Sequence, residues 1–397
     1  MTKAYVCGTL DSKDVELGYV RDCLTATGVR TCLVDLGTSG RAVAADIPAA
    51  EVAAHHPAGA EAVFTGDRGT AVTGMAEAFQ AFIVTCRDLG GIIGAGGSGN
   101  TSLVAPAMRA LPVGVPKVLV STVASGNVAP YVGPADIMML HAVADVQGLN
   151  AITRRVLGNA AHALAGMMQH QIPVPETKAK PALGLTMFGV TTPCIQAVSK
   201  ALEADYDCLV FHATGTGGQT LEKLVESGLV QAMLDLTTTE IADLIVGGVF
   251  PATDSRLEAV IATGTPYVGS VGALDMVNFG AKESVPDGFR DRLLYVHNPQ
   301  VTLMRTTPEE NVRFGQWIGA KLNRMTGPVR FLLPLGGVSL IDVPGQPFHD
   351  PDADRALFEA IEADFEPTAT KKLVRVPAAI NDEAFAAAAV AALHEIV

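Results

Sequence analysis

The sequence predicts an α/β protein of two Rossmann-like domains, each with a mostly parallel sheet and a ligand cleft at the carboxyl ends of its strands. Short apolar runs rich in β-branched residues recur along the 397 residues, and stretches of helical length separate them. Strands that alternate with such helices form right-handed βαβ units and a parallel sheet. Abundant glycine (40 residues) and few aromatics (5%) favour tightly packed strand–loop–helix units over an all-β sandwich.

The first half contains five apolar runs of strand length and several longer stretches with helical patterning. The predicted strands are residues 4–7, 31–36, 62–65, 91–94 and 117–121. The predicted helices are residues 15–27, 75–89, 101–110 and a long helix over 148–171.

The chain is expected to divide after this long helix. The segment QIPVPETKAKP (171–181) holds three prolines and several charges and is the best linker candidate. We therefore predict domains over residues 1–178 and 179–397. In the second half, the predicted strands are 181–188, 208–212, 243–247, 267–269, 293–297 and 329–334, and an alanine-rich helix over 381–397 follows them.

Composition excludes several classes of protein. The net charge is −13 and no Lys/Arg block occurs, which argues against binding to nucleic acid or to an anionic membrane surface. No apolar stretch is long enough to span a membrane, and the N-terminus lacks the apolar core of a signal peptide. None of the six cysteines forms a C-x-x-C pair, which is typical of a reducing compartment without structural zinc. We expect a cytoplasmic protein that binds a small molecule.

The segment GAGGSGNTS (94–102) follows an apolar strand and opens a helix. Its glycines allow close backbone approach, and a helix N-terminus favours phosphate. It is neither a strict dinucleotide-binding fingerprint nor a Walker A loop. The alternative is a tight turn with a good N-cap. The candidate phosphate-binding residues are Gly96, Gly97, Ser98, Gly99, Asn100 and Thr101.

Two further places in the first half supply candidates for the same cleft. Thr9, Asp11 and Lys13 follow the first predicted strand, although helix capping would explain them too. Asp35 ends the second predicted strand, where a ribose-binding carboxylate stands in nucleotide-binding domains.

The second half has its own polar segments after predicted strands. FGVTTP (188–193) and HATGTGGQ (212–219) each open a helix, and the second has the glycines of an anion-binding loop. HNPQVTLMRT (297–306) follows another strand. The candidate substrate-binding residues are Thr191, Thr192, Thr214, Gly215, Thr216, Gly217, Gly218 and Asn298.

Six titratable side chains in these segments are candidates for chemistry. Histidine transfers protons near neutral pH, and arginine binds carboxylate or phosphate. The candidate catalytic residues are His212, His297, Asp254, Asp275, Arg256 and Arg305. The alternative is that they cap helices and satisfy buried loops. No spacing predicts a metal held by protein ligands, so Mg²⁺ is expected only together with a nucleotide.

These motifs occur in the same order in a known family. GTLDSK, GAGGSGNTS, FGVTTP, HATGTGG, SVGALDMVNFG, HNPQVTLMRT and PGQPFHDPDAD resemble the Tm-one-like ATP-binding domain family over essentially the whole chain. The resemblance implies two α/β domains, ATP bound in the first one, and a homo-oligomer. It implies no settled reaction.

The expected function is therefore that of an ATP-binding metabolic enzyme acting on a small organic acid or a phosphorylated metabolite. The alternative is a non-catalytic, nucleotide-responsive binding or regulatory protein.

Overall fold

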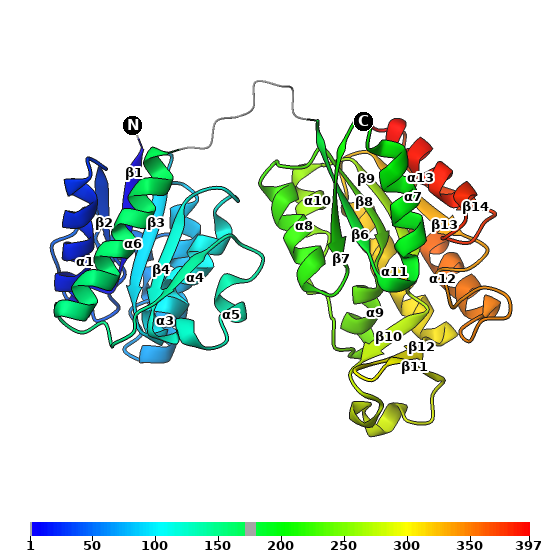
Figure 1. The fold of residues 1–397 in the computed structure, drawn as a ribbon, viewed down its shortest axis with the longest axis horizontal. Coiled ribbons are helices and arrows are strands. Elements are labelled where there is room, and N and C mark those ends of the chain that lie inside the picture. Colours follow the sequence, from blue (N-terminus) through cyan, green and yellow to red (C-terminus); the bar gives the residue numbers. More distant parts are fainter. Residues whose placement is uncertain (1, 171–179) are drawn as a thin grey trace. The chain divides into compact units, whose positions relative to one another are not determined.

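We describe a computed structural model of the chain, which covers residues 2–170 and 180–397 (Figure 1). The chain divides into two compact units, Met1–Pro175 and Glu176–Val397, and each is described by itself. The predicted boundary at residue 178 and most of the predicted linker lie outside the described residues. Within the described residues, no helix is long and apolar enough to cross a membrane.

The first unit is built on a five-stranded parallel sheet in the order β2-β1-β3-β4-β5. Its strands are β1 (Lys3–Gly8), β2 (Thr31–Asp35), β3 (Leu89–Gly96), β4 (Lys117–Ser121) and β5 (Met138–His141). Its helices are α1 (Leu10–Ala26), α2 (Ala49–Ala53), α3 (Arg68–Ile83), α4 (Ser98–Ala110), α5 (Ala129–Val132) and α6 (Ala151–Gln169), with short 3-10 helices η1 (Ala60–Ala62) and η2 (Thr122–Ser125).

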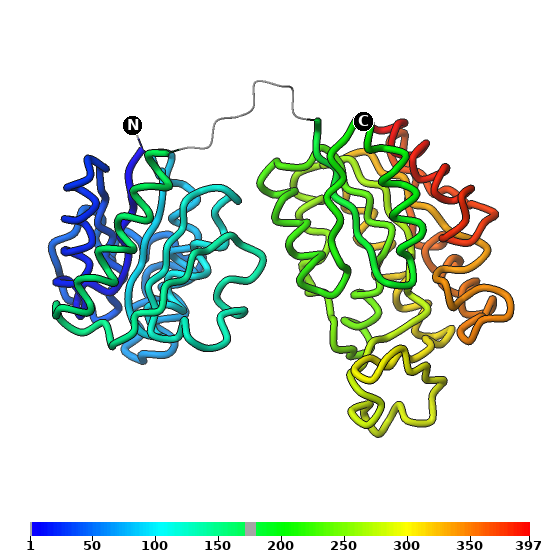
Figure 2. The backbone as a smooth tube through the Cα atoms, in the orientation of Figure 1, coloured from blue at the N-terminus to red at the C-terminus, as the bar shows by residue number. Residues whose placement is uncertain are grey.

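Helices cover both faces of this sheet (Figures 1 and 2). On one face α1 and α6 pack against the strands through Leu17, Val20 and Leu164. On the other face α2, α3 and α4 bury Phe79 and Leu103. Because both faces are covered, the strands are apolar on both sides, as expected for a parallel sheet.

The second unit has a six-stranded parallel sheet in the order β14-β13-β9-β8-β6-β7 and a small antiparallel sheet in the order β10-β12-β11. Its strands are β6 (Ala182–Met187), β7 (Asp207–His212), β8 (Ala232–Thr237), β9 (Tyr267–Gly272), β10 (Met276–Phe279), β11 (Leu294–Asn298), β12 (Val301–Arg305), β13 (Val329–Pro334) and β14 (Lys371–Val376).

Helices also cover both faces of the larger sheet. The core between the sheet, α7 and α13 contains Ile195 and Phe385, and the core on the opposite face contains Leu221, Phe314 and Leu357. The helices are α7 (Thr192–Leu202), α8 (Thr216–Glu226), α9 (Thr239–Val246), α10 (Glu258–Thr263), α11 (Pro308–Arg324), α12 (Pro351–Asp364) and α13 (Glu383–His394), with 3-10 helices η3 (Gly189–Thr191), η4 (Lys282–Ser284) and η5 (Asp287–Phe289). The predicted fold class, two Rossmann-like units with mostly parallel sheets, is confirmed.

Two predicted strands are wrong. Residues 62–65 are the last residue of η1 and the turn that follows it, between Gly59 and Gly66, both of which have positive φ. Residues 243–247 mostly belong to α9, because periodicity alone cannot distinguish so short an apolar run in a helix from a buried strand. As a result, the glycine-rich segment follows the third strand of its sheet instead of the fourth. Asp254 and Arg256 follow the helix α9 instead of a strand.

Arg256 lies in the core of the second unit, 2% exposed and bonded to three carboxylates. Its Nη2 donates to both oxygens of Asp235 at 2.8 Å, Nη1 donates to Glu222 at 2.8 Å, and Nε donates to Glu240. Glu240 also accepts a hydrogen bond from the backbone amide of Gly215 at 2.7 Å. Burial raises the pKa of Glu222 and of Glu240, and the Arg256 charge opposes that shift. This cluster joins β8, α8 and α9 to the segment after β7.

Arg305, at the end of β12, is the centre of a second buried cluster. Its Nη2 donates to Asp354 at 3.0 Å and to Asp342 at 3.2 Å. Its Nε donates to the backbone carbonyl of Phe348 at 2.7 Å. The arginine therefore fastens the long segment between β13 and α12.

Asp275 belongs to the second cluster and is fully buried. Its Oδ2 accepts a hydrogen bond from Ser339 at 2.8 Å, while its Oδ1 has no partner among the described residues. Burial, reinforced by the negative charge of Asp342, raises the pKa of Asp275 to about 7.

Replacement of Arg256 by methionine should destabilise the chain strongly. It would leave the buried carboxylates without their cation, which typically costs about 3–5 kcal/mol. Arg324→Met is the matched control, because Arg324 also pairs with a glutamate, Glu258, but is 55% exposed. An exposed pair contributes about 0–1 kcal/mol. Urea unfolding of both variants measures the difference, and equal losses would contradict a stabilising role for the buried cluster.

The stability contributed by Asp275 should fall as the pH rises. The pKa of Asp275 is about 7 in the folded chain, whereas the ordinary value is 3.8. Between these two pH values the folded state keeps a proton that the unfolded state has released. The free energy of unfolding therefore decreases between about pH 4 and pH 7. Asp275→Asn mimics the protonated carboxyl, and its melting temperature relative to wild type should rise across this window. Asp254→Asn, at an exposed position, is the control. A difference between Asp275→Asn and wild type that does not change with pH would contradict this prediction.

Candidate functional site

The first unit has a topological switch point between β1 and β3. From β1 the chain runs through α1 to β2 on one side, and it later enters β3 on the other side of β1. The connections that leave β1 and β3 diverge at their carboxyl ends, where a crevice forms. The segments that follow these two strands therefore face the same space.

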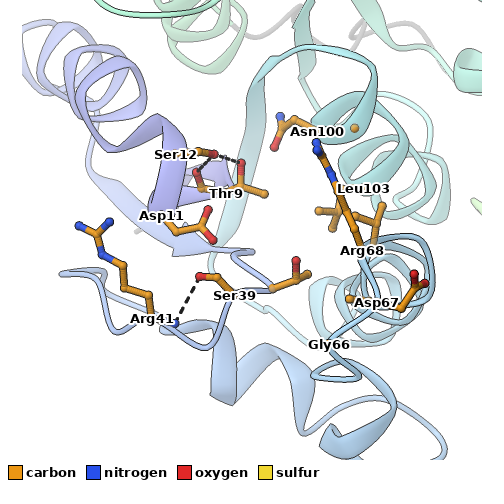
Figure 3. A pocket seen from close by; sticks show the side chains of 14 residues that line it. Thr9, Asp11, Ser12, Ser39, Arg41, Gly66, Asp67, Arg68, Asn100 and Leu103 are labelled. Carbon is orange, nitrogen blue, oxygen red and sulfur yellow. Dashed lines mark hydrogen bonds between the residues drawn. The ribbon is translucent and has the colours of Figure 1, made fainter.

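A cavity of about 700 Å³ occupies this crevice (Figure 3). We call it the switch-point pocket. It is lined by Thr9, Asp11, Ser12, Thr38, Ser39, Arg41, Gly66, Asp67, Arg68, Ala71, Val72, Gly99, Asn100 and Leu103. Hydroxyl and charged groups dominate one part of the lining, and Ala71, Val72 and Leu103 supply an apolar part.

The N-terminus of α4 borders this pocket without a side-chain cap, because its N-cap residue is Gly97. At α1 the N-cap residue Thr9 does not cap the helix either, but the amide of Leu10 donates to Asp35 at 3.0 Å. The first amides of a helix have no intrahelical partner and carry a partial positive charge. Uncapped N-termini at a pocket are therefore suited to an anion.

Asn100, in the first turn of α4, has an unsatisfied atom in this lining. It is 7% exposed, and its Nδ2 donates to the carbonyl of Ala95 at 3.1 Å. Its Oδ1 has no hydrogen-bond partner among the described residues. A Cβ on Gly8 would lie 2.8 Å from that oxygen, so the close approach of β1 requires glycine. The side chain is thus held by the protein with one acceptor left over.

Four charged side chains enter the pocket and balance one another in sign. Arg41 and Arg68 are the cations, and Asp11 and Asp67 are the anions. Figure 3 shows Asp11 and Arg68 directed toward the central space from α1 and α3. A Cβ built on Gly99 would lie 3.9 Å from Arg68 Nη2, so this guanidinium lies beside the N-terminus of α4.

The structure brings four of the predicted residues into this lining, namely Thr9, Asp11, Gly99 and Asn100. Gly96, Gly97, Ser98, Thr101, Lys13 and Asp35 are not part of it. Thr101 is buried and shares a 2.6 Å hydrogen bond with Ser121. Lys13 has non-helical backbone angles within α1.

Asp35 has a backbone role beside the pocket. It is 2% exposed, and its Oδ1 accepts hydrogen bonds from the amides of Leu10 at 3.0 Å and Gly37 at 2.8 Å. Burial raises the pKa of Asp35, and these two hydrogen bonds oppose the shift. The carboxylate therefore ties the end of β2 to the start of α1.

Sequence reasoning missed ten of the fourteen lining residues. These residues are Ser12, Thr38, Ser39, Arg41, Gly66, Asp67, Arg68, Ala71, Val72 and Leu103. A usable signal existed in TGDRGT (65–70), because Asp67 is the N-cap of α3 and accepts from the amide of Thr70 at 2.9 Å. The mistaken strand at residues 62–65 concealed this helix start.

The second unit has a smaller cavity of about 220 Å³, which we call the histidine pocket. It is lined by Phe188, Gly189, Val190, His212, Thr214, Phe250, His297, Asn298, Val301 and Leu303. These residues come from the carboxyl ends of β6 and β7, from the segment after α9, and from the β11–β12 hairpin. The structure thus brings together His212, Thr214, His297 and Asn298 as predicted site residues.

The other predicted residues of the second unit do not line this pocket. Arg256, Arg305 and Asp275 are buried in the ion clusters, and Asp254 is exposed. Thr191 shares a 2.7 Å hydrogen bond with Thr237, and Thr192 donates to the Phe188 carbonyl at 3.3 Å. Thr216 is exposed and begins α8.

The glycines after β7 are explained by packing. A Cβ on Gly215 would lie 2.3 Å from the carbonyl of Pro251, and one on Gly217 would lie 1.8 Å from the carbonyl of His212. On Gly218 it would meet Glu240 at 2.0 Å. The segment therefore needs glycine to lie against the Arg256 cluster.

No metal centre is evident in residues 2–170 and 180–397, since they contain no group of three or more His, Cys, Asp or Glu side chains placed to hold an ion.

Comparison with known proteins places the chain in a family. The model described as "Uncharacterised protein family (UPF0261) N-terminal domain" matches residues 2–173, and the corresponding C-terminal domain matches residues 180–397. The chain is 55% identical to a UPF0261 protein of Rhizobium meliloti, over 100% of this chain and 99% of that one. It is 44% identical to one of Clostridium tetani, over 97% and 96%.

A plant protein is also similar. ToMV resistance protein Tm-1(GCR237) of Solanum lycopersicum is 41% identical over 99% of this chain, which spans 56% of the tomato protein. Among solved structures, the Streptomyces glycosyltransferase SsfS6 with thymidine diphosphate has 13% identity and a TM-score of 0.19, covering 68% of this chain and 82% of that one. The sequence matches confirm the predicted resemblance: the chain belongs to the UPF0261 family and is a homologue of the tomato Tm-1 protein.

Proposed function

We propose that the first unit binds ATP together with Mg²⁺ in the switch-point pocket. The observation that carries the proposal is the uncapped N-terminus of α4 at the strand switch point. A cavity of about 700 Å³ also lies within the usual range for small-molecule sites. Arg68 beside the α4 N-terminus adds a full positive charge to the backbone amides.

The lining offers partners for each part of such a ligand. The amides of α4 and Arg68 are suited to phosphate oxygens, and Asp11 offers the carboxylate oxygen that Mg²⁺ prefers. Ala71, Val72 and Leu103 suit a base. Because Asp35 is committed to backbone amides, Thr38 and Ser39 replace it as candidates for the ribose.

At the level of the whole chain, we propose an enzyme that acts on a small organic acid or a phosphorylated metabolite. The two imidazoles at the histidine pocket support this, because histidine transfers protons near neutral pH. The alternative is a binding or regulatory protein that responds to nucleotide without chemistry. We further propose a cytoplasmic location and self-association. Light scattering with and without ATP tests the self-association.

Substitution of Gly99 by valine should abolish most ATP binding. A Cβ there meets nothing closer than Arg68 Nη2 at 3.9 Å, so the fold tolerates the change, while the side chain occupies the pocket. We expect at least about a tenfold weaker affinity by calorimetry, which corresponds to about 1.4 kcal/mol.

Gly166→Val is the matched control for this variant, because Gly166 lies in α6 with open space around its Cα. It should bind ATP as wild type does. Lack of binding by the wild type at millimolar ATP, or equal binding by both variants, would overturn the proposed site.

Asp11→Asn should selectively remove the contribution of Mg²⁺. If the carboxylate is a metal ligand, the variant binds ATP in EDTA as wild type does, but Mg²⁺ no longer improves the affinity. Calorimetric titrations with and without the metal measure this. Asp22→Asn, at an exposed position in the same helix, is the control. An undiminished Mg²⁺ effect in Asp11→Asn would assign the metal to other ligands.

A further inference from the structure

The histidine pocket contains two imidazoles from distant parts of the chain. His212 ends β7 and His297 lies in β11, and both line the same cavity of about 220 Å³. Neither imidazole makes a hydrogen bond or an ion pair to another described residue. The ring of His212 instead contacts that of Phe188, with centroids 5.2 Å apart. Both rings therefore keep their polar atoms available to a ligand.

The remainder of the lining is mostly apolar. Phe188, Val190, Phe250, Val301 and Leu303 surround the space, and Thr214 and Asn298 are its other polar side chains. Of the residues that line this cavity, only the two histidines ionise. A suitable ligand thus has a small apolar body and one polar head.

The charged groups near the pocket indicate that the polar head of the ligand carries one negative charge and not two. Glu240 and Arg256, which lie against the segment after β7, are buried and bonded to each other. Arg305 ends β12, beyond Leu303, but is occupied by Asp342 and Asp354. A phosphate dianion is usually bound by arginine as well as by backbone amides, and none of the residues that line this cavity is an arginine. Two imidazoles can hold a single carboxylate with N–H donors.

We propose that the histidine pocket binds a small carboxylic acid with a compact apolar body, its carboxylate held by His212 and His297. This deepens the proposed enzymatic function, since it selects the organic acid over the phosphorylated metabolite. It does not rest on nucleotide binding by the first unit.

Such a site has a defined pH dependence. A protonated imidazole donates two N–H groups and adds a positive charge, so the carboxylate binds the protonated form better. Burial lowers the pKa of His212, and a bound carboxylate opposes this shift. Binding is therefore linked to proton uptake, and the affinity falls as the pH rises through neutrality.

The test uses the full chain and benzoate as the probe, with benzamide as its neutral counterpart and phenyl phosphate as the dianionic one. Calorimetry at about pH 6 and about pH 8 should show benzoate binding at least about tenfold tighter than benzamide, and tighter at the lower pH. Isovalerate replaces benzoate in a parallel titration, and binding of either acid with this pattern supports the proposal.

Substitutions locate the binding. The substitutions His212→Gln and His297→Gln should each weaken the affinity for benzoate at least about tenfold at the lower pH. His394→Gln, at an exposed position, should leave this affinity unchanged. Gly189→Val places a side chain in the pocket without a clash, because nothing lies within 4 Å of its Cβ position, and it should weaken benzoate binding. Gly288→Val is its matched control and should bind benzoate as wild type does.

Three results would overturn the proposal. They are binding of neither acid, equal binding of benzoate and benzamide, and tighter binding of phenyl phosphate than of benzoate. The last result would leave the proposed enzymatic function intact with a phosphorylated substrate. ATP titration of the same preparation reports separately on the first unit.

Discussion

The ion cluster around Arg256 is the constraint on which the second unit depends most. Burial of an unpaired charge is prohibitive, so a guanidinium that is 2% exposed must be matched by carboxylates. Asp235, Glu222 and Glu240 supply them from β8, α8 and α9. The cluster therefore holds together elements that are distant in sequence, and the segment after β7 takes its shape by lying on it. The position of His212 at the mouth of a cavity follows from that packing.

The first unit is organised by a different constraint, namely the order of its strands. Because β1 lies between β2 and β3, the segments after β1 and β3 must diverge and leave a crevice. Asp35 then closes the base of this crevice by binding the amides of Leu10 and Gly37. The N-terminal amides of α4 remain beside it. The pocket is thus a consequence of topology, and its side chains are placed by backbone hydrogen bonds.

Much of the fold could be predicted from local patterns, and the failures have physical causes. β1, β2, β3 and β4 were recognisable because each is a short apolar run followed by glycine or serine. The prediction for residues 243–247 failed because periodicity cannot distinguish a short apolar run in a helix from a buried strand. β8 was missed although all its residues are buried, since its Asp235 looks polar until its partner is known.

The same limit applies to the candidate sites. Sequence order suggested that polar residues after strands meet at one edge of a sheet, and this brought Thr9, Asp11, Gly99 and Asn100 together, and likewise His212 and His297. It could not tell a side chain that faces a cavity from one that faces the core. Arg256 and Arg305 are the clearest cases, because long-range carboxylates decide where they point. Arg41 was missed because it lies five residues beyond the predicted strand at 31–36, and Arg68 was missed because the mistaken strand at 62–65 concealed the start of α3.

A chain with a net charge of −13 still has two ways to attract an anion. The first unit offers backbone amides at helix N-termini, whose partial charge does not titrate, with Arg68 beside them. The second unit has its cluster arginines neutralised in the core, so the ionisable groups at its pocket are imidazoles, whose charge appears only when they are protonated. The two proposed ligands are therefore anions of different chemistry. A polyphosphate suits the permanent field of the first unit, and a single carboxylate with an apolar body suits the titratable groups of the second.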